Sequence, residues 1–139
     1  MASLPPRRSP AAARLDPIPV AWGGLVASIG LMAGAGRDWP IRLAASAVSF
    51  GLGGFLAGVR ATGRRPLHAI SAWVAGYAIH AVFVAIARII EAFGGREAPA
   101  LVAGSGRNWL IAAVWAFAFA LIGGLVANSW LRPVGRHPR

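Results

Sequence analysis

Residues 67–93 read LHAISAWVAGYAIHAVFVAIARIIEAF, and Arg88 and Glu91 are their only Arg, Lys, Asp or Glu residues. Crossing the hydrocarbon of a bilayer takes roughly 20 helical residues at about 1.5 Å each, so this stretch is long enough. Polar and apolar residues do not alternate along it, as they do along the strands of a transmembrane barrel. Because a segment inside lipid must satisfy its own backbone hydrogen bonds, we predict a transmembrane α-helix.

Three further apolar stretches surround it, at about 18–35, 41–59 and 109–131. Short segments rich in Gly, Pro and Arg separate them and indicate connections. The fold class is therefore predicted to be all-α, an integral membrane bundle of four transmembrane helices. The predicted parts are a basic disordered tail at 1–16, the four-helix transmembrane domain at 17–133 and a short basic tail at 134–139.

The composition also indicates a membrane protein. Of the 139 residues, 57% are hydrophobic and 13% charged, against about 45–50% and about 25% in soluble domains. The 14 basic residues are all arginines, and the net charge is +10. Since they lie between apolar stretches, we expect them to face anionic lipid headgroups and not nucleic acid. The chain has no cysteine and only 3 scattered histidines, so we expect no metal site and no cofactor.

The distribution of arginines predicts the orientation in the membrane. Nine lie in the N-terminal tail, the connection near residues 60–66 and the C-terminal tail, while five lie on the opposite side. This excess predicts that both termini are cytoplasmic. A cleavable signal peptide is an alternative, with Arg7, Arg8 and Arg14 before the first apolar stretch and a cleavage site near residues 33–35.

An internal repeat favours an uncleaved first helix. Shifting the sequence by 70 residues places 34–59 on 104–129 with 8 identities in 26 positions. We interpret this as two tandem helical hairpins. The shared Gly-x-Gly-Arg-(Asp/Asn)-Trp motif predicts interfacial anchors, with helix N-caps, headgroup-level tryptophans and phosphate-binding arginines; a twin anion or ligand site at the two helix N-termini is the alternative. The anchors are Arg37, Asp38, Trp39, Arg107, Asn108 and Trp109.

Glycines in the second and fourth stretches predict close helix packing. Several have the small-xxx-small spacing that lets two helix backbones approach in a membrane. The residues assigned to this packing are Gly51, Gly54, Gly58, Gly123 and Gly124.

The third stretch has a polar face. At about 100° per residue, the side chains at 73, 77, 80, 84, 88 and 91 fall within a sector of about 80°. His80 lies near the middle of the stretch, where an ionisable group in a membrane is a functional candidate; a neutral histidine bonded to a packing partner is the alternative. The candidate polar intramembrane site is Tyr77, His80, Arg88 and Glu91, the last two close enough to pair.

The stretch from Gly53 to His68 includes Gly53-Gly54-Phe55-Leu56-Ala57-Gly58. It resembles small uncharacterised bacterial four-helix membrane proteins with a Gly-Gly-Phe-(Ile/Leu)-Ala-Gly-Arg motif at the end of the second helix. Here Val59 displaces the arginine by one position, and Ala69 stands where those proteins have glycine. The resemblance implies a fold and a location in the bacterial inner membrane, and it assigns no functional residue.

These patterns predict a non-enzymatic membrane protein that packs with itself, as a homo-oligomer, or with other membrane subunits. The four acidic residues lie near predicted helix ends, and no serine has an evident base. The alternative is a small oligomeric channel or transporter whose path follows the polar face around His80. A lipid-modifying enzyme using Arg37, Arg107 and His80 is a third hypothesis.

Overall fold

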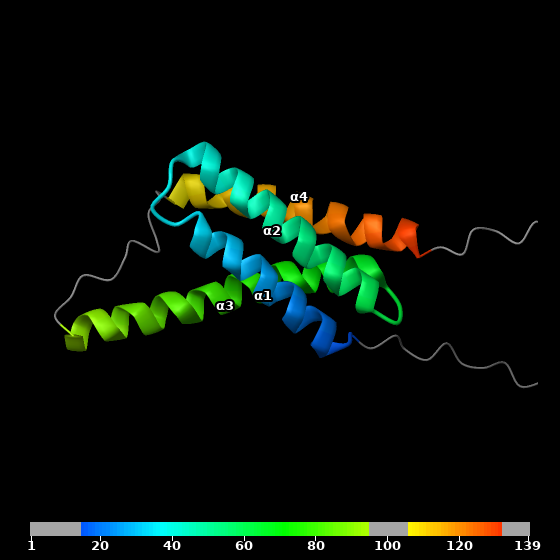
Figure 1. Cartoon of the computed structure of the whole chain (residues 1–139), viewed down its shortest axis with the longest axis horizontal. Helices are drawn as coiled ribbons and strands as arrows, with labels where there is room; N and C mark the ends of the chain where they lie inside the picture. Colours follow the sequence, from blue (N-terminus) through cyan, green and yellow to red (C-terminus); the bar gives the residue numbers. More distant parts are fainter. Residues whose placement is uncertain (1–14, 95–105, 132–139) are drawn as a thin grey trace, which may run out of the picture.

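The computed structural model describes residues 15–94 and 106–131, and every regular element in them is an α-helix (Figure 1). This confirms the predicted all-helical fold for that part of the chain. The predicted tails fall outside it, apart from residues 15 and 16. The helices are α1 (Pro17–Ala33), α2 (Trp39–Arg60), α3 (Arg65–Gly94) and α4 (Gly106–Trp130).

Helices α1 and α3 run in one direction, and α2 and α4 run in the other (Figure 1). Helices α2 and α3 form the middle of the bundle, since each contacts the other three. Over the described residues, α1 and α4 do not touch. Consequently Leu15, the connection at 61–64 and Leu131 lie at one end of the bundle, and the connection at 34–38 lies at the other.

The helix starts follow local rules in part. Asp16 caps α1, because its Oδ1 accepts a hydrogen bond from the Ile18 N–H at 3.1 Å. Asp38 occupies the N-cap position of α2 but makes no capping bond with its side chain. The prediction of an N-cap at Asn108 is wrong, because α4 already begins at Gly106 and Asn108 lies within its first turn.

The interior consists mainly of small residues. Phe50 is the largest fully buried side chain among the described residues, and Ala27, Ala116 and Ala120 pack with it. Large aliphatic side chains instead face outward, as Ile90 does at 64% exposure. A soluble domain buries such residues, whereas a membrane protein packs small residues inside and exposes large apolar ones to lipid.

Within residues 15–94 and 106–131, three helices are long and apolar enough to cross a membrane, namely α2, α3 and residues Asn108–Trp130 of α4. The mean hydropathies of their apolar 18-residue stretches are 1.4, 1.8 and 2.4, respectively. Helix α1 is also apolar but has only 17 residues, or about 26 Å. Three helices of spanning length and one shorter helix therefore form the bundle.

Candidate functional site

A cavity of about 550 Å³ opens among the four helices, near the connection between α1 and α2. Every helix contributes to its wall, so no single stretch of sequence specifies it. The lining residues are Leu31, Ala35, Trp39, Arg42, Ser46, Tyr77, His80, Ala81, Val84, Ala85, Asn108, Trp109 and Ala112.

The unequal lengths of the helices position this cavity. Helix α3 has 30 residues, against 22 in α2 and 25 in α4, and its second half runs past the first turns of α2 and α4 (Figure 1). The middle of α3 is therefore level with those first turns. Tyr77 illustrates this register, because its ring centroid lies 5.9 Å from that of Trp109.

His80 also lies level with the first turns of α2 and α4. Its position halfway along α3 suggests the centre of a membrane span, but it lines the cavity together with Trp39 and Asn108, near the starts of α2 and α4. The difference arises because the half of α3 beyond His80 has no counterpart of equal length in its neighbours.

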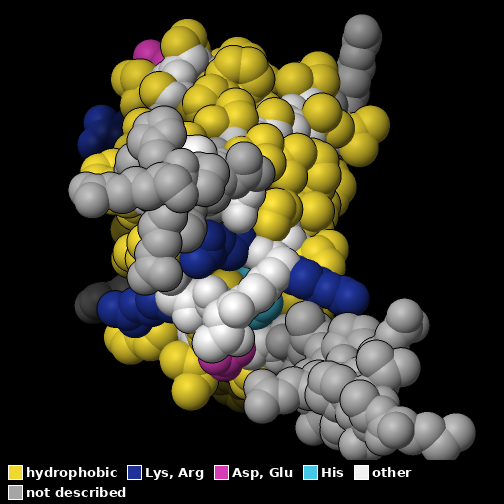
Figure 2. Space-filling view, turned by 90° about the vertical axis from the view of Figure 1, so that its right-hand side faces the viewer, with side chains coloured by type: hydrophobic (Ala, Val, Ile, Leu, Met, Phe, Trp, Pro, Cys, Tyr) yellow, Lys and Arg dark blue, Asp and Glu magenta, His cyan; other side chains and the backbone are white. Residues whose placement is uncertain are grey.

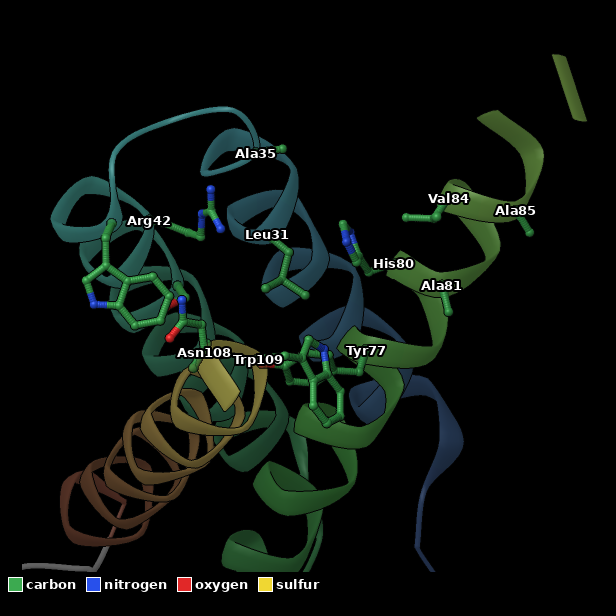
Figure 3. Close-up of a pocket in the computed structure, with 13 residues that line it drawn as sticks. Leu31, Ala35, Arg42, Tyr77, His80, Ala81, Val84, Ala85, Asn108 and Trp109 are labelled. Carbon is green, nitrogen blue, oxygen red and sulfur yellow. The ribbon is translucent and has the colours of Figure 1, made fainter. Parts of the chain in front are cut away.

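Polar groups face each other across the cavity. Figure 3 shows Arg42 and Asn108 on one side and Tyr77 and His80 of α3 on the other. The Arg42 guanidinium donates a hydrogen bond to the Arg37 carbonyl at 3.2 Å, which holds it beside the α1–α2 connection.

Tyr77 is fixed by aromatic packing. Its ring stacks on Phe50 with centroids 5.3 Å apart and meets the edge of Trp73 at 5.6 Å. Trp73 is held in turn by a hydrogen bond from its Nε1–H to the Ala113 carbonyl at 3.2 Å. Within the described part of the chain, the buried Tyr77 hydroxyl has no hydrogen-bond partner. The packing thus holds the Tyr77 hydroxyl, which can both donate and accept a hydrogen bond, in a fixed position at the cavity.

The predicted polar face of α3 divides into two parts. Tyr77 and His80 line the cavity, whereas Arg88 and Glu91 do not. Arg88 and Glu91 form an ion pair of 2.9 Å, with side chains 63% and 28% exposed. The four residues therefore do not make one site, because α3 carries the ion pair beyond the other helices.

The predicted interfacial anchors also divide. Trp39, Asn108 and Trp109 contribute to the cavity wall, whereas Arg37 and Asp38 are exposed outside it. The side chain of Arg107 lies outside the described residues. The repeated motif thus brings its tryptophans to one cavity, although they are 70 residues apart in sequence.

Sequence reasoning missed three polar residues. One is Ser46, which lines the cavity and donates its hydroxyl hydrogen to the Leu43 carbonyl at 2.9 Å. Another is Arg42, which lines the cavity one turn after Trp39. Its closeness in sequence to the Trp39 motif is the feature from which it could have been predicted. His68 is only 2% exposed and lies at the opposite end of the bundle. Its Nε2 accepts a hydrogen bond from the Asp16 N–H at 3.0 Å, and its Nδ1 lies 3.3 Å from the Arg64 carbonyl.

The arrangement suits binding. Among the described residues, no group of three or more His, Cys, Asp or Glu side chains could hold a metal ion. The cavity combines a cation, several hydrogen-bonding side chains and apolar walls, which is the usual make-up of a small-molecule pocket.

No family model matches the chain, and no curated protein or solved structure is significantly similar to it.

Proposed function

We propose that this chain is a non-enzymatic integral membrane protein that binds a small or amphiphilic molecule in the cavity among its four helices. The observation that carries this proposal is the cavity of about 550 Å³, to which every helix contributes. Such a volume falls within the roughly 300–1,000 Å³ typical of small-molecule sites. The polar side chains of its lining can orient a bound molecule, and the apolar side chains can contribute to its binding affinity.

The proposal includes a location and an orientation. Three helices of spanning length and an apolar exterior support insertion in a membrane. The excess of arginine at the end that holds Arg60, Arg64 and Arg65 supports a cytoplasmic location for that end and for both termini. The bacterial inner membrane fits this arrangement. The exposed apolar surface also leaves room for contacts with a second copy or another membrane subunit.

Native mass spectrometry of the protein in nanodiscs tests the binding role. Ala112→Phe places a large side chain at the cavity wall, whereas Val114→Phe adds the same ring to a residue of α4 that is 62% exposed. We expect the wild type and Val114→Phe to retain a bound molecule and Ala112→Phe to lose it. Equal retention by both variants would place the molecule elsewhere, and no retained molecule in any of them would leave only a packing role.

A second candidate is a small oligomeric channel or transporter. It is favoured by His80, an ionisable residue that lines the cavity together with Arg42. Flux of protons or ions into liposomes should then depend on His80 and fall in His80→Ala. Unchanged flux in that variant, with Arg88→Gln as a control outside the cavity, contradicts a path through His80.

A further inference from the structure

The charge of the cavity wall points to the kind of molecule that it holds. Arg42 is the single permanent charge among the described lining residues, and none of them is a carboxylate. Asp38, the N-cap residue of α2 one turn before Arg42, is exposed and outside the lining. Since a guanidinium stays protonated in proteins, the wall offers a fixed positive charge.

Hydrogen-bonding groups surround this charge. His80 and Tyr77 face Arg42 and Asn108 across the cavity (Figure 3). The Asn108 amide and the Tyr77 hydroxyl can both donate, and the hydroxyl has no partner within the described part of the chain. Several donors around one cation match an anion with more than one acceptor oxygen, such as a carboxylate or a phosphate.

The rest of the wall is apolar. Leu31 of α1, Val84 of α3 and Ala112 of α4 line it, and the rings of Trp39 and Trp109 add aromatic surface. A free inorganic anion would leave this surface without a partner. An acyl or other apolar chain would cover it and gain the free energy of removing that surface from water.

We infer that the cavity binds the anionic group of an amphiphile, a carboxylate or phosphate attached to an apolar chain, with Arg42 as its charge partner. This inference rests on the proposed binding function and names the class of ligand. The anionic group lies between Arg42 and the polar side chains of α3 and α4, and the chain lies along the apolar wall. A phospholipid headgroup and a free fatty acid both offer this chemistry.

Three probes of equal chain length test the inference, namely 12-bromododecanoate, 12-bromododecyl phosphate and 12-bromododecanol. The protein is held in nanodiscs of zwitterionic phosphatidylcholine, and quenching of tryptophan fluorescence by the bromine is measured. We expect the two anions to saturate at concentrations at least about tenfold below the alcohol, as for a hydrogen bond to a charged group. Tighter binding of the phosphate indicates a phospholipid headgroup, and tighter binding of the carboxylate a free fatty acid.

Variants separate the cavity from the general surface charge. Arg42→Gln should remove the preference for anions, while Arg42→Lys, which keeps the charge, should retain most of it. Arg88→Gln removes an arginine of α3 outside the cavity and should leave the preference unchanged. Circular dichroism checks that each variant keeps its helices.

Three results would overturn the inference. Equal saturation by the alcohol shows an apolar pocket without preference for anions, and the proposed function then stands. If Arg88→Gln and Arg42→Gln lose the preference for the anionic probes equally, the probes are attracted by the positive charge of the whole protein surface and not by the cavity. If no probe quenches in a saturable way and Ala112→Phe behaves as the wild type does, both the ligand class and the binding function fail.

Discussion

At the scale of single residues, His68 shows how one buried polar side chain can join two helices. Its Nε2 accepts the Asp16 N–H, so the proton of the neutral ring lies on Nδ1 and points to the Arg64 carbonyl. Arg64 has φ +46, a left-handed conformation that a non-glycine residue adopts at some cost. The histidine thus fixes the start of α1 and the turn before α3 at the same place.

Removing this side chain should destabilise the bundle. In His68→Phe, the ring volume is roughly kept, but the Asp16 N–H loses the acceptor that His68 Nε2 provides. The Arg64 carbonyl loses its contact with Nδ1 and keeps the backbone N–H groups of Leu67 and His68 as donors. We expect a loss of about 1–3 kcal/mol in the free energy of unfolding, the usual cost of leaving buried polar groups unsatisfied. Unfolding in mixed detergent micelles measures it.

The control for this variant is Ser129→Ala. Ser129 is exposed, and its hydroxyl donates a hydrogen bond to the Val126 carbonyl of its own helix at 2.9 Å. It should unfold as the wild type does. Equal stability of His68→Phe and the wild type would show that the His68 contacts contribute nothing to the fold.

At the scale of elements, α2 and α4 approach each other so closely that backbone meets backbone. A Cβ added at Gly54 would collide with the Ala120 backbone, and one at Gly123 would collide with the Gly51 backbone. A Cβ at Gly51 itself would meet only the Phe119 carbonyl at 3.8 Å, an ordinary contact. The glycines of one predicted packing face therefore differ in how much they constrain the contact.

This difference gives a matched pair of variants. Gly54→Ala should cost about 1–3 kcal/mol of stability, because the two helices must move apart. Gly51→Ala should be neutral or up to about 1 kcal/mol more stable, because alanine favours the helix and the space is open. Detergent unfolding of the two proteins measures both values. Equal effects would contradict the close approach at Gly54.

At the scale of the whole molecule, the two ends of the bundle differ. The end formed by the connection at 61–64 carries Arg60, Arg64 and Arg65. Figure 2 looks onto this end and shows basic side chains gathered around its middle, with a histidine among them and hydrophobic side chains around. The opposite end carries the α1–α2 connection, and the cavity lies near it. In the proposed orientation, the cavity is nearer to the periplasmic face.

Cysteine labelling tests this orientation, since the chain has no cysteine of its own. Arg37→Cys and Gly63→Cys each place one thiol in a connection, at opposite ends of the bundle. An added Cβ at Gly63 meets no atom of the described residues within 4 Å. In spheroplasts, a membrane-impermeant maleimide should label Cys at position 37 and not at 63. The reverse pattern would invert the orientation, and equal labelling of both would argue against a spanning bundle.

Much of the fold follows from the sequence because its determinants are local. The apolar length of 67–93 predicts α3 closely, and the observed helix is Arg65–Gly94, which also takes in Pro66 from the predicted connection. The start of α4 is predicted less well, since Asn108 is a good N-cap by type yet lies inside the helix. The capping preference of one residue competes with the packing of the first turn against neighbouring helices. The sequence pattern does not show which of the two decides where the helix begins.

The sequence by itself determined the helices, their apolar character and the residue types of a polar face on α3. Only the tertiary structure decided that Tyr77 and His80 share a cavity with Arg42 and the two motif tryptophans, while Arg88 and Glu91 lie outside it. Periodicity and length are properties of one segment. The position of one helix relative to another along the bundle depends on the connections and on where glycines allow two backbones to touch. It is therefore decided only when the helices pack.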